Sequence, residues 1–347
     1  MNELHEQIAR EAARIAENEL EPRAAEVDEG KAEVALAPLA ELGLVAPDLP
    51  ADVGGADADP VARSIVLEVL AGTCASTALA VGIQGLAAHA AFRRGERDLA
   101  RRFALAEETV ALAFSEGRGG EDSELVTVLE AGRVRGTKNV LGPARAGTLL
   151  VLAKDALVLV DTTAASIETA APRTGLRGLP PRVARLDAAA VVLGGVVEAE
   201  RARAEARALA APVAAGLVAR ALEEARRYAM MRQQFGRAIA RFQGVQFLVA
   251  QIHEAREGCR ALARAAALAM GRGELPAFLA AACALEGPGR AVKAALDCVQ
   301  VFGGTGYTRE VVAERLLRDA LALQGLAGAA GAGSERTISA ARLAPLS

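Results

Sequence analysis

Residues 226–236 read RRYAMMRQQFG, and residues 298–307 read CVQVFGGTGY. In both segments a long helical pattern stops, first at an arginine with an aromatic ring and later at paired glycines beside an amide. Arginine binds phosphate through a planar fork of donors, and glycine lets a ligand approach the backbone closely. The two segments together therefore suit a flat, phosphate-bearing ligand. Taken alone, Arg232 and Gly236 would also fit an ordinary helix C-terminus.

The hydrophobic pattern changes its period twice along the chain. Residues 1–108 carry apolar side chains at three- and four-residue spacing, as at Ile8 and Ala12, which predicts helices. Residues 109–197 hold short apolar runs between tight turns, which predicts an antiparallel sheet or small barrel. The helical period returns over residues 198–347. We therefore expect an α+β fold that is mostly α, with an N-terminal helical domain, a middle β domain and a C-terminal helical bundle.

Individual elements can be placed within this plan. The expected strands are 110–114, 125–129, 133–137, 149–153, 157–160, 183–186 and 190–193. Because these strands do not alternate with helices, a Rossmann unit is disfavoured. The expected long helices of the last domain are 213–231, 242–270, 275–302 and 311–323. Four long helices with short links predict an antiparallel four-helix bundle.

Composition excludes several classes of function. Of the 347 residues 52% are hydrophobic and 24% charged, which favours a sizeable core over disorder. The net charge is only −3, and no basic run is interleaved with aromatic residues, so nucleic-acid binding is disfavoured. The N-terminus lacks the order of a signal peptide, and no uncharged apolar run has membrane-spanning length. We expect a cytoplasmic protein without a membrane partner.

The thiols and imidazoles do not indicate a metal site. The cysteines at 74, 259, 283 and 298 are widely scattered and lack the spacing of zinc ligands. With only three histidines, no cluster of ligands is evident in the sequence. We expect the cysteines to be small buried hydrophobic side chains in a reducing compartment.

In their order and spacing, the two opening segments resemble the flavin-binding signatures of the acyl-CoA dehydrogenase family. The segment FQGVQ at 242–246 follows the first of them, as in that family. Further matches are ELGL at 41–44, and FSEG at 114–117, which resembles the strand and loop that meet the flavin ring. The resemblance extends along nearly the whole chain.

The resemblance implies FAD as the cofactor. The implied contacts are Phe114 and Ser115 at the isoalloxazine, Arg232 and Phe235 at the diphosphate and adenine, and Gln300, Gly303 and Gly304 along the same nucleotide. In the family these groups are shared between two subunits, so the resemblance implies an oligomer, usually a tetramer. Arg207 matches an arginine that reaches CoA in relatives, although a solvated arginine at a helix start explains it equally well.

The family's reaction is α,β-desaturation of an acyl-CoA thioester, in which a carboxylate removes the α-proton and hydride passes to the flavin. The two positions at which relatives carry that glutamate are Ala327 and Ala206 here. A methyl group cannot accept a proton. Glu205 is adjacent to the second position, but a shift of one residue turns a helical side chain by about 100°. Glu335 would require an unusual loop.

Three functional hypotheses follow from these positions. The first is an FAD-dependent acyl-CoA dehydrogenase of fatty acid metabolism, with an atypical base or a related subunit that supplies the glutamate. Its partners would be an acyl-CoA thioester and an electron-transfer flavoprotein or similar acceptor, within a homo-tetramer or hetero-oligomer. The second is an oxidase or hydroxylase on the same scaffold, which would not need the base. The third is an inactive structural subunit.

Overall fold

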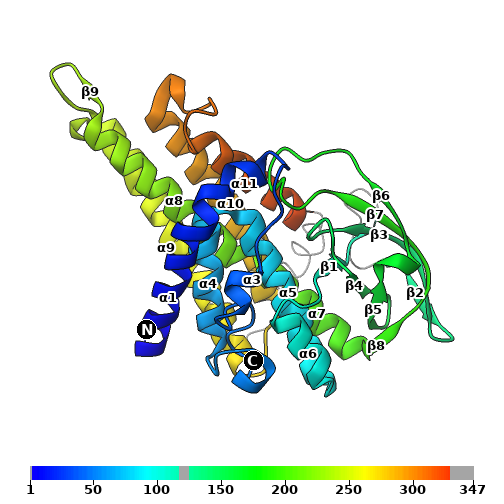
Figure 1. Cartoon of the computed structure of the whole chain (residues 1–347). Coiled ribbons are helices and arrows are strands. Elements are labelled where there is room, and N and C mark those ends of the chain that lie inside the picture. The colour runs from blue at the N-terminus through cyan, green and yellow to red at the C-terminus, as the bar shows by residue number, and fades with distance from the viewer. Residues whose placement is uncertain (1, 117–124, 329–347) are drawn as a thin grey trace, which may run out of the picture.

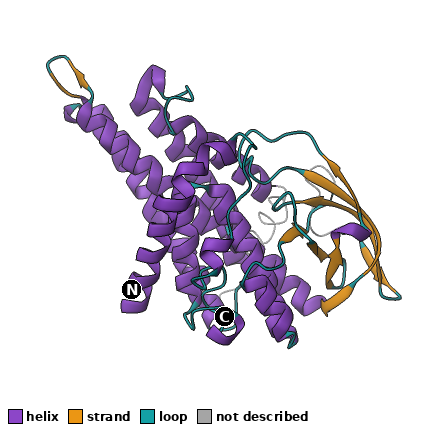
Figure 2. Cartoon of the chain, in the orientation of Figure 1, coloured by secondary structure: helices purple, strands orange, loops and turns teal. Residues whose placement is uncertain are grey.

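The computed structural model describes residues 2–116 and 125–328. The described chain is mainly helical, with all its long helices gathered beside two small sheets (Figure 1). Figure 2 shows the strands of these sheets together at one side of the molecule, apart from the helices before and after them. This confirms the predicted α+β class and the order of helices, sheet and helices.

The first part of the chain is helical. Its elements are α1 (Glu3–Ile15), a π turn (Ala16–Leu20), a 3-10 turn (Glu21–Arg23), α2 (Ala24–Asp28), α3 (Ala37–Ala40), a 3-10 turn (Ala51–Val53), α4 (Pro60–Thr73), α5 (Ala75–Arg94) and α6 (Arg97–Ala104). Helix α4 begins at Asp59, whose carboxylate accepts hydrogen bonds from the backbone N–H groups of Val61 and Ala62. Such a cap satisfies N–H groups that have no partner inside the helix.

Helix α5 is the central helix of this part. Among the described helices, it alone is long and apolar enough to cross a membrane by length and composition. Nearly all of its side chains are buried within the protein, which is typical of the core helix of a globular fold. It packs against α6, α7 and the first strand, and so connects the helices to the sheets.

Eight strands form two four-stranded sheets. The first has the order β1 (Val110–Ala113), β4 (Thr148–Leu152), β5 (Leu157–Asp161), β8 (Val191–Gly194). The second has the order β2 (Val128–Glu130), β3 (Arg133–Val140), β7 (Arg182–Ala189), β6 (Ser166–Thr169). The pairs within these sheets are antiparallel, as expected, except that β1 runs parallel to β4. The chain leaves β1 for the second sheet and returns to the first in the same direction.

Strands β4 and β5 are buried on both faces, which explains their continuous apolar sequence. Leu150 and Leu152 point toward the helices, where they join a cluster with Leu86 and Phe103. Leu149 and Val151 point the other way, into the apolar layer between the two sheets. The sheets are thereby fixed to the helical part, and the space between them and the helices is available for a site.

The last part of the chain is helical again. Its elements are α7 (Val196–Ala208), α8 (Ala210–Met231), the hairpin β9 (Gln233–Gln234) and β10 (Arg237–Ala238), a 3-10 turn (Ile239–Arg241), α9 (Gln243–Gly271), α10 (Ala277–Phe302), a 3-10 turn (Gly303–Thr305) and α11 (Ala313–Gly328). Helix α10 packs against α8, α9 and α11, which confirms the predicted bundle. Helix α7 was not predicted as a separate element.

Small side chains let the helices approach closely. A Cβ atom at Gly216 of α8 would lie 2.1 Å from the carbonyl oxygen of Glu68 in α4, so only glycine fits there. All four cysteines are buried free thiols, as expected, three of them within helices and Cys74 between α4 and α5. Burial raises the pKa of Cys259, Cys283 and Cys298 to about 12, which keeps them protonated and unreactive.

Candidate functional site

A cavity of about 280 Å³ lies between the two sheets and the helices. Residues from β1, β3, the loop before β7, and helices α5, α7, α8, α10 and α11 contribute to its wall. Its lining is mostly apolar, with a few polar and charged groups, which is typical of a small-molecule site. The residues that matter below are Leu79, Ile83, Phe114, Ser115, Asn139, Arg173, Arg182, Arg203, Ala206, Arg207, Ala210 and Leu323.

The segment after β1 carries the predicted flavin-ring residues to this cavity. Phe114 and Ser115 both line it. The carbonyl oxygen of Phe114 accepts a hydrogen bond of 3.2 Å from Lys138 Nζ, and that of Ser115 accepts one of 2.9 Å from the N–H of Asn139. These bonds lie beside the isolated antiparallel bridge between Leu112 and Leu141 and hold the segment in place. Phe114 and Ser115 are thereby held at the cavity wall, and their contact with FAD stays a prediction.

A buried ion pair supports the same segment. Lys138 Nζ lies 2.7 Å from the carboxylate of Glu116, and the lysine side chain is fully buried. Glu116 also accepts hydrogen bonds from the backbone N–H groups of Val126 and Thr127. Burial raises the pKa of Glu116, but the bonds from Lys138, Thr127 and Val126 outweigh it and lower the pKa below its usual value.

Lys138 was not predicted as a site residue, although strand alternation contains a signal for its burial. Along β3 the side chains of Val134 and Val140 point inward. Lys138 shares their parity, so strand alternation alone places it on the buried face. A buried lysine requires an anionic partner, which Glu116 supplies.

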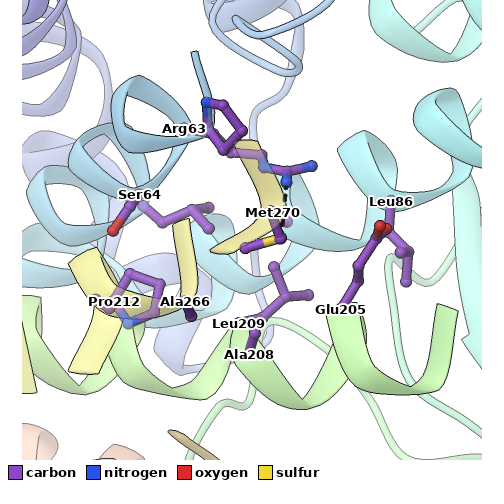
Figure 3. Close-up of a pocket in the computed structure, with 13 residues that line it drawn as sticks. Arg63, Ser64, Leu86, Glu205, Ala208, Leu209, Pro212, Ala266 and Met270 are labelled. Atoms are coloured by element: carbon purple, nitrogen blue, oxygen red, sulfur yellow. Dashed lines mark hydrogen bonds between the residues drawn. The ribbon is translucent and has the colours of Figure 1, made fainter. Parts of the chain in front are cut away.

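On helix α7 the successive residues Glu205 and Ala206 line two different pockets. Ala206 and Arg207 line the large cavity. The Glu205 carboxylate instead accepts hydrogen bonds from Arg93 Nη1 and Nη2 at 3.2 and 3.4 Å. Glu205 lines a separate small pocket (Figure 3), so its position argues against the role of a base in the large cavity.

Of the two other expected positions of the base, Ala327 is among the described residues and Glu335 is not. Ala327 belongs to the last turn of α11, next to Leu326, which lines the large cavity. Glu335 lies outside the described residues. Among the described residues that line the large cavity there is no aspartate or glutamate.

The small pocket, of about 20 Å³, has room for no more than a water molecule. In it the Arg63 guanidinium donates to the sulfur of Met270 at 3.3 Å (Figure 3). Beside it, the buried carboxylate of Asp48 lies 2.9 Å from His89 and 3.5 Å from Arg63. Burial raises the pKa of Asp48, but Arg63 and His89 outweigh it and hold that pKa well below its usual range. This cluster is a structural crosslink.

The other predicted FAD contacts lie at the opposite end of the bundle. Helix α8 begins at the cavity with Ala210 and ends 22 residues later at Arg232, about 33 Å away. Beyond Arg232 the hairpin β9–β10 projects from the molecule (Figure 1). Its tip is Phe235 and Gly236, with φ of 53° and 76°, and the Phe235 ring is 91% exposed. Two residues with positive φ are typical of the tight turn of such a hairpin.

The end of α10 lies near the base of this hairpin. Tyr228 of α8 stacks on Phe302 of α10 with ring centroids 4.3 Å apart. Gln300, Gly303 and Gly304 are exposed in the same region, and no atom lies within 4 Å of a Cβ placed at either glycine. The structure therefore brings Arg232, Phe235, Gln300 and the two glycines to one end of the bundle, away from Phe114 and Ser115.

Among the described residues, no group of three or more His, Cys, Asp or Glu side chains could hold a metal ion. Three further arginines, at 173, 182 and 203, line the large cavity with Arg207 and were not predicted from the sequence. Arg203 precedes Arg207 by one helical turn, a spacing that could have indicated a shared face. Arg173 belongs to a loop, where no periodic pattern exists to indicate its direction.

Comparison with known proteins identifies relatives along nearly the whole chain. Residues 2–105 match the acyl-CoA dehydrogenase N-terminal domain, and residues 194–343 match the acyl-CoA dehydrogenase C-terminal domain. The chain is 30% identical to cyclohex-1-ene-1-carbonyl-CoA dehydrogenase of Geobacter metallireducens, over 88% of this chain and 89% of that protein. It is 29% identical to the probable acyl-CoA dehydrogenase FadE25 of Mycobacterium tuberculosis, over 92% and 90%. The solved butyryl-CoA dehydrogenase of Megasphaera elsdenii shares the fold, with a TM-score of 0.88, 21% identity and 99% coverage of both chains.

Proposed function

Because this chain belongs to the acyl-CoA dehydrogenase family, we propose that it is an FAD-dependent oxidoreductase that desaturates an acyl-CoA thioester. The family consists of flavoprotein oxidoreductases that act on such thioesters. The observation that carries the proposal is the large cavity, which brings Phe114 and Ser115 together with Arg207 and an apolar wall. A flavin ring and an acyl chain could meet there with water largely excluded.

The residues expected to contact FAD lie in two separate groups. Phe114 and Ser115 lie at the cavity, whereas Arg232 lies at the far end of α8, about 33 Å along that helix from Ala210 at the cavity, with Phe235 and Gln300 at the same end of the bundle. We infer that the exposed hairpin of a second subunit reaches into this cavity. Arg232 suits a diphosphate, since its guanidinium fork matches phosphate geometry. The Phe235 ring is 91% exposed in one chain, and in this proposal an adenine or a second subunit would cover it.

In this proposal FAD, when bound, would accept hydride from the β-carbon of the thioester. The chain's own side chains would bind and orient the substrate. Leu79, Ile83 and Leu323 would hold the acyl chain on the apolar wall, and Arg207 would contact the CoA portion. Ala206 supplies no proton acceptor. The acceptor would come from Glu335 or from a related subunit, and electrons would leave to an electron-transfer flavoprotein or similar protein.

A second candidate is a flavoprotein that needs no base, such as an oxidase or hydroxylase, or an inactive FAD-binding subunit. The observation that favours it is the lack of a carboxylate among the described residues lining the cavity. Rapid reoxidation of the reduced flavin by air would favour an oxidase over a dehydrogenase.

Cofactor content and subunit arrangement test the proposal first. We expect the purified protein to carry about one FAD per chain and to be an oligomer of two or more chains. Removal of the hairpin tip should release FAD. A monomer that retains FAD would contradict a site shared between subunits.

A further inference from the structure

Two arginines reach the large cavity from the sheet side. Arg182 begins β7, and Arg173 lies in the loop between β6 and β7. This loop is firmly anchored, because Leu176 and Leu179 are buried in the helical core. A Cβ atom at Gly175 would lie 2.1 Å from the backbone oxygen of Arg318, so the loop packs directly on α11. Arg173 is therefore held in place by the fold.

Neither guanidinium has a carboxylate partner among the described residues. Arg173 donates to the carbonyl oxygen of Leu179 within its own loop. Arg182 donates to the carbonyl oxygens at positions 142, 143 and 144, at 3.3, 2.6 and 2.7 Å. The Nε atoms of both are buried without a hydrogen-bond partner in the described structure. Burial lowers the pKa of both side chains, that of Arg173 to about 10.

Other arginines of the same region are neutralised. Arg185, which is also in β7, lies 2.7 Å from the carboxylate of Glu168 on the neighbouring strand. Arg318 lies 2.7 Å from that of Asp28. Arg185 and Arg318 thus have carboxylate partners. Arg173 and Arg182, which line the cavity, have no carboxylate partner among the described residues.

A positive charge that is partly buried and has no counter-ion carries a desolvation cost, which a bound anion would offset. Arg203 and Arg207 of α7 line the same cavity from the helix side. Guanidinium groups recognise carboxylates through paired N–H donors, and Arg173 retains its Nε and Nη1 for such a bond.

We propose that the acyl group of the substrate carries a second acidic group, a carboxylate or an anion of similar shape, which Arg173 and Arg182 bind. The inference rests on the proposed function, because it takes the ligand of the cavity to be an acyl thioester. It narrows the substrate class from neutral fatty acyl-CoA to acidic acyl-CoA. The phosphates of CoA or FAD are the competing anions for these two arginines.

The test compares two thioesters that differ only in the distal carboxylate. The FAD-loaded protein is titrated with glutaryl-CoA, with pentanoyl-CoA and with free CoA, and binding is followed by the flavin spectrum or by calorimetry. We expect glutaryl-CoA to bind at least tenfold more tightly than pentanoyl-CoA. Equal affinity for the two thioesters would overturn the inference, and this comparison requires no variant.

Substitutions of the two arginines then test whether these side chains cause the preference for glutaryl-CoA over pentanoyl-CoA. Arg173→Gln and Arg182→Gln should reduce the affinity for glutaryl-CoA to that for pentanoyl-CoA, with FAD content and free CoA affinity unchanged. Arg185→Gln, on the same strand but paired with Glu168, is the matched control and should keep the preference. Arg173→Lys keeps the positive charge and should retain part of the preference for glutaryl-CoA.

The remaining outcomes contradict the inference in distinguishable ways. Equal weakening of both thioesters and of free CoA would assign the arginines to CoA phosphates. Loss of FAD from the variants would assign them to the cofactor. If no thioester binds to the wild-type protein at all, the proposed function fails, and the inference fails with it.

Discussion

Glu205 and Ala206 are neighbours in the sequence but line different pockets. The Glu205 carboxylate binds Arg93 at 3.2 Å, whereas Ala206 lines the large cavity beside Arg207. The rotation of about 100° per helical residue accounts for this difference. Because of it, the acidic residue nearest to an expected base position belongs to a structural ion pair.

Glu205→Gln should therefore leave function unchanged. Arg93 keeps its bonds to Glu198, and the amide oxygen of glutamine can replace part of the lost contact. We expect flavin content and the spectral response to acyl-CoA to be those of the wild type, with a loss of about 1 kcal/mol in the free energy of unfolding. Loss of the substrate response with the flavin still bound would instead identify Glu205 as the base.

Ala206→Glu should introduce a proton acceptor into the cavity. A well-placed general base contributes about 10²–10⁴-fold to a rate, so exchange of the α-proton of a bound acyl-CoA with D₂O should accelerate by a factor in that range. Ala204→Glu is the control, since Ala204 lies on the same helix but does not line the cavity. Exchange no faster than in the control would show that position 206 does not reach the α-carbon.

Lys138→Met should destabilise the protein strongly, because it leaves the Glu116 carboxylate without its cation. Removal of one partner from a buried ion pair typically costs about 3–5 kcal/mol. Urea denaturation of Lys138→Met should show a loss of that size, whereas Lys154→Met, at an exposed position, should be nearly neutral. Equal stabilities of the two variants would mean that the pair contributes little.

Asp319 should make stability depend on pH in the acid range. Burial raises its pKa to about 6 from the ordinary 3.8, and the backbone N–H of Leu176 donates to it at 2.6 Å. Between these two values the folded state binds more protons than the unfolded state, so its contribution to stability falls as the pH rises. The fall is at most about 3 kcal/mol and is complete above pH 6.

Asp319→Asn isolates this contribution. The amide oxygen still accepts the bond from Leu176, but the side chain no longer ionises. Relative to the wild type, the variant should gain stability as the pH is raised from about 4 to 7, as measured by denaturation at each pH. A difference between the two proteins that does not change with pH would contradict the raised pKa.

Phe235→Ala should weaken FAD binding without a loss of folding stability, since the ring is exposed within one chain. Retained FAD per chain and thermal unfolding of the apoprotein are the two readouts. Phe278→Ala removes another exposed ring, on α10, and should retain FAD. Equal retention in both variants would argue against a role of the hairpin in the site.

Helical periodicity was sufficient to predict the bundle, because α8, α9 and α10 are long and their apolar faces regular. Strand β6 was not predicted, since Ser166–Thr169 offers a single apolar residue and pairs only through its neighbour β7. The parallel direction of β1 and β4 arises from the path of the chain between the sheets, which no local pattern records.

The candidate site, like the fold, was only partly predictable from the sequence. Phe114, Ser115, Ala206 and Arg207 were singled out from the sequence and do line one cavity, although their contacts with ligands stay predictions. Arg173 could not be found in this way, because a loop of twelve residues folded onto α11 sets its position. Long-range packing decides which charged side chains face a cavity, and the periodicity of apolar residues along the sequence does not report that packing.

The most direct test of the proposed function is an anaerobic titration of the FAD-loaded protein with acyl-CoA thioesters, glutaryl-CoA among them, followed by visible absorbance. We predict that the protein carries FAD and that at least one thioester bleaches the flavin band, with acidic thioesters most effective. A colourless protein that takes up no added FAD, or a flavin spectrum that no thioester alters, would contradict the assignment of this cavity to acyl-CoA oxidation.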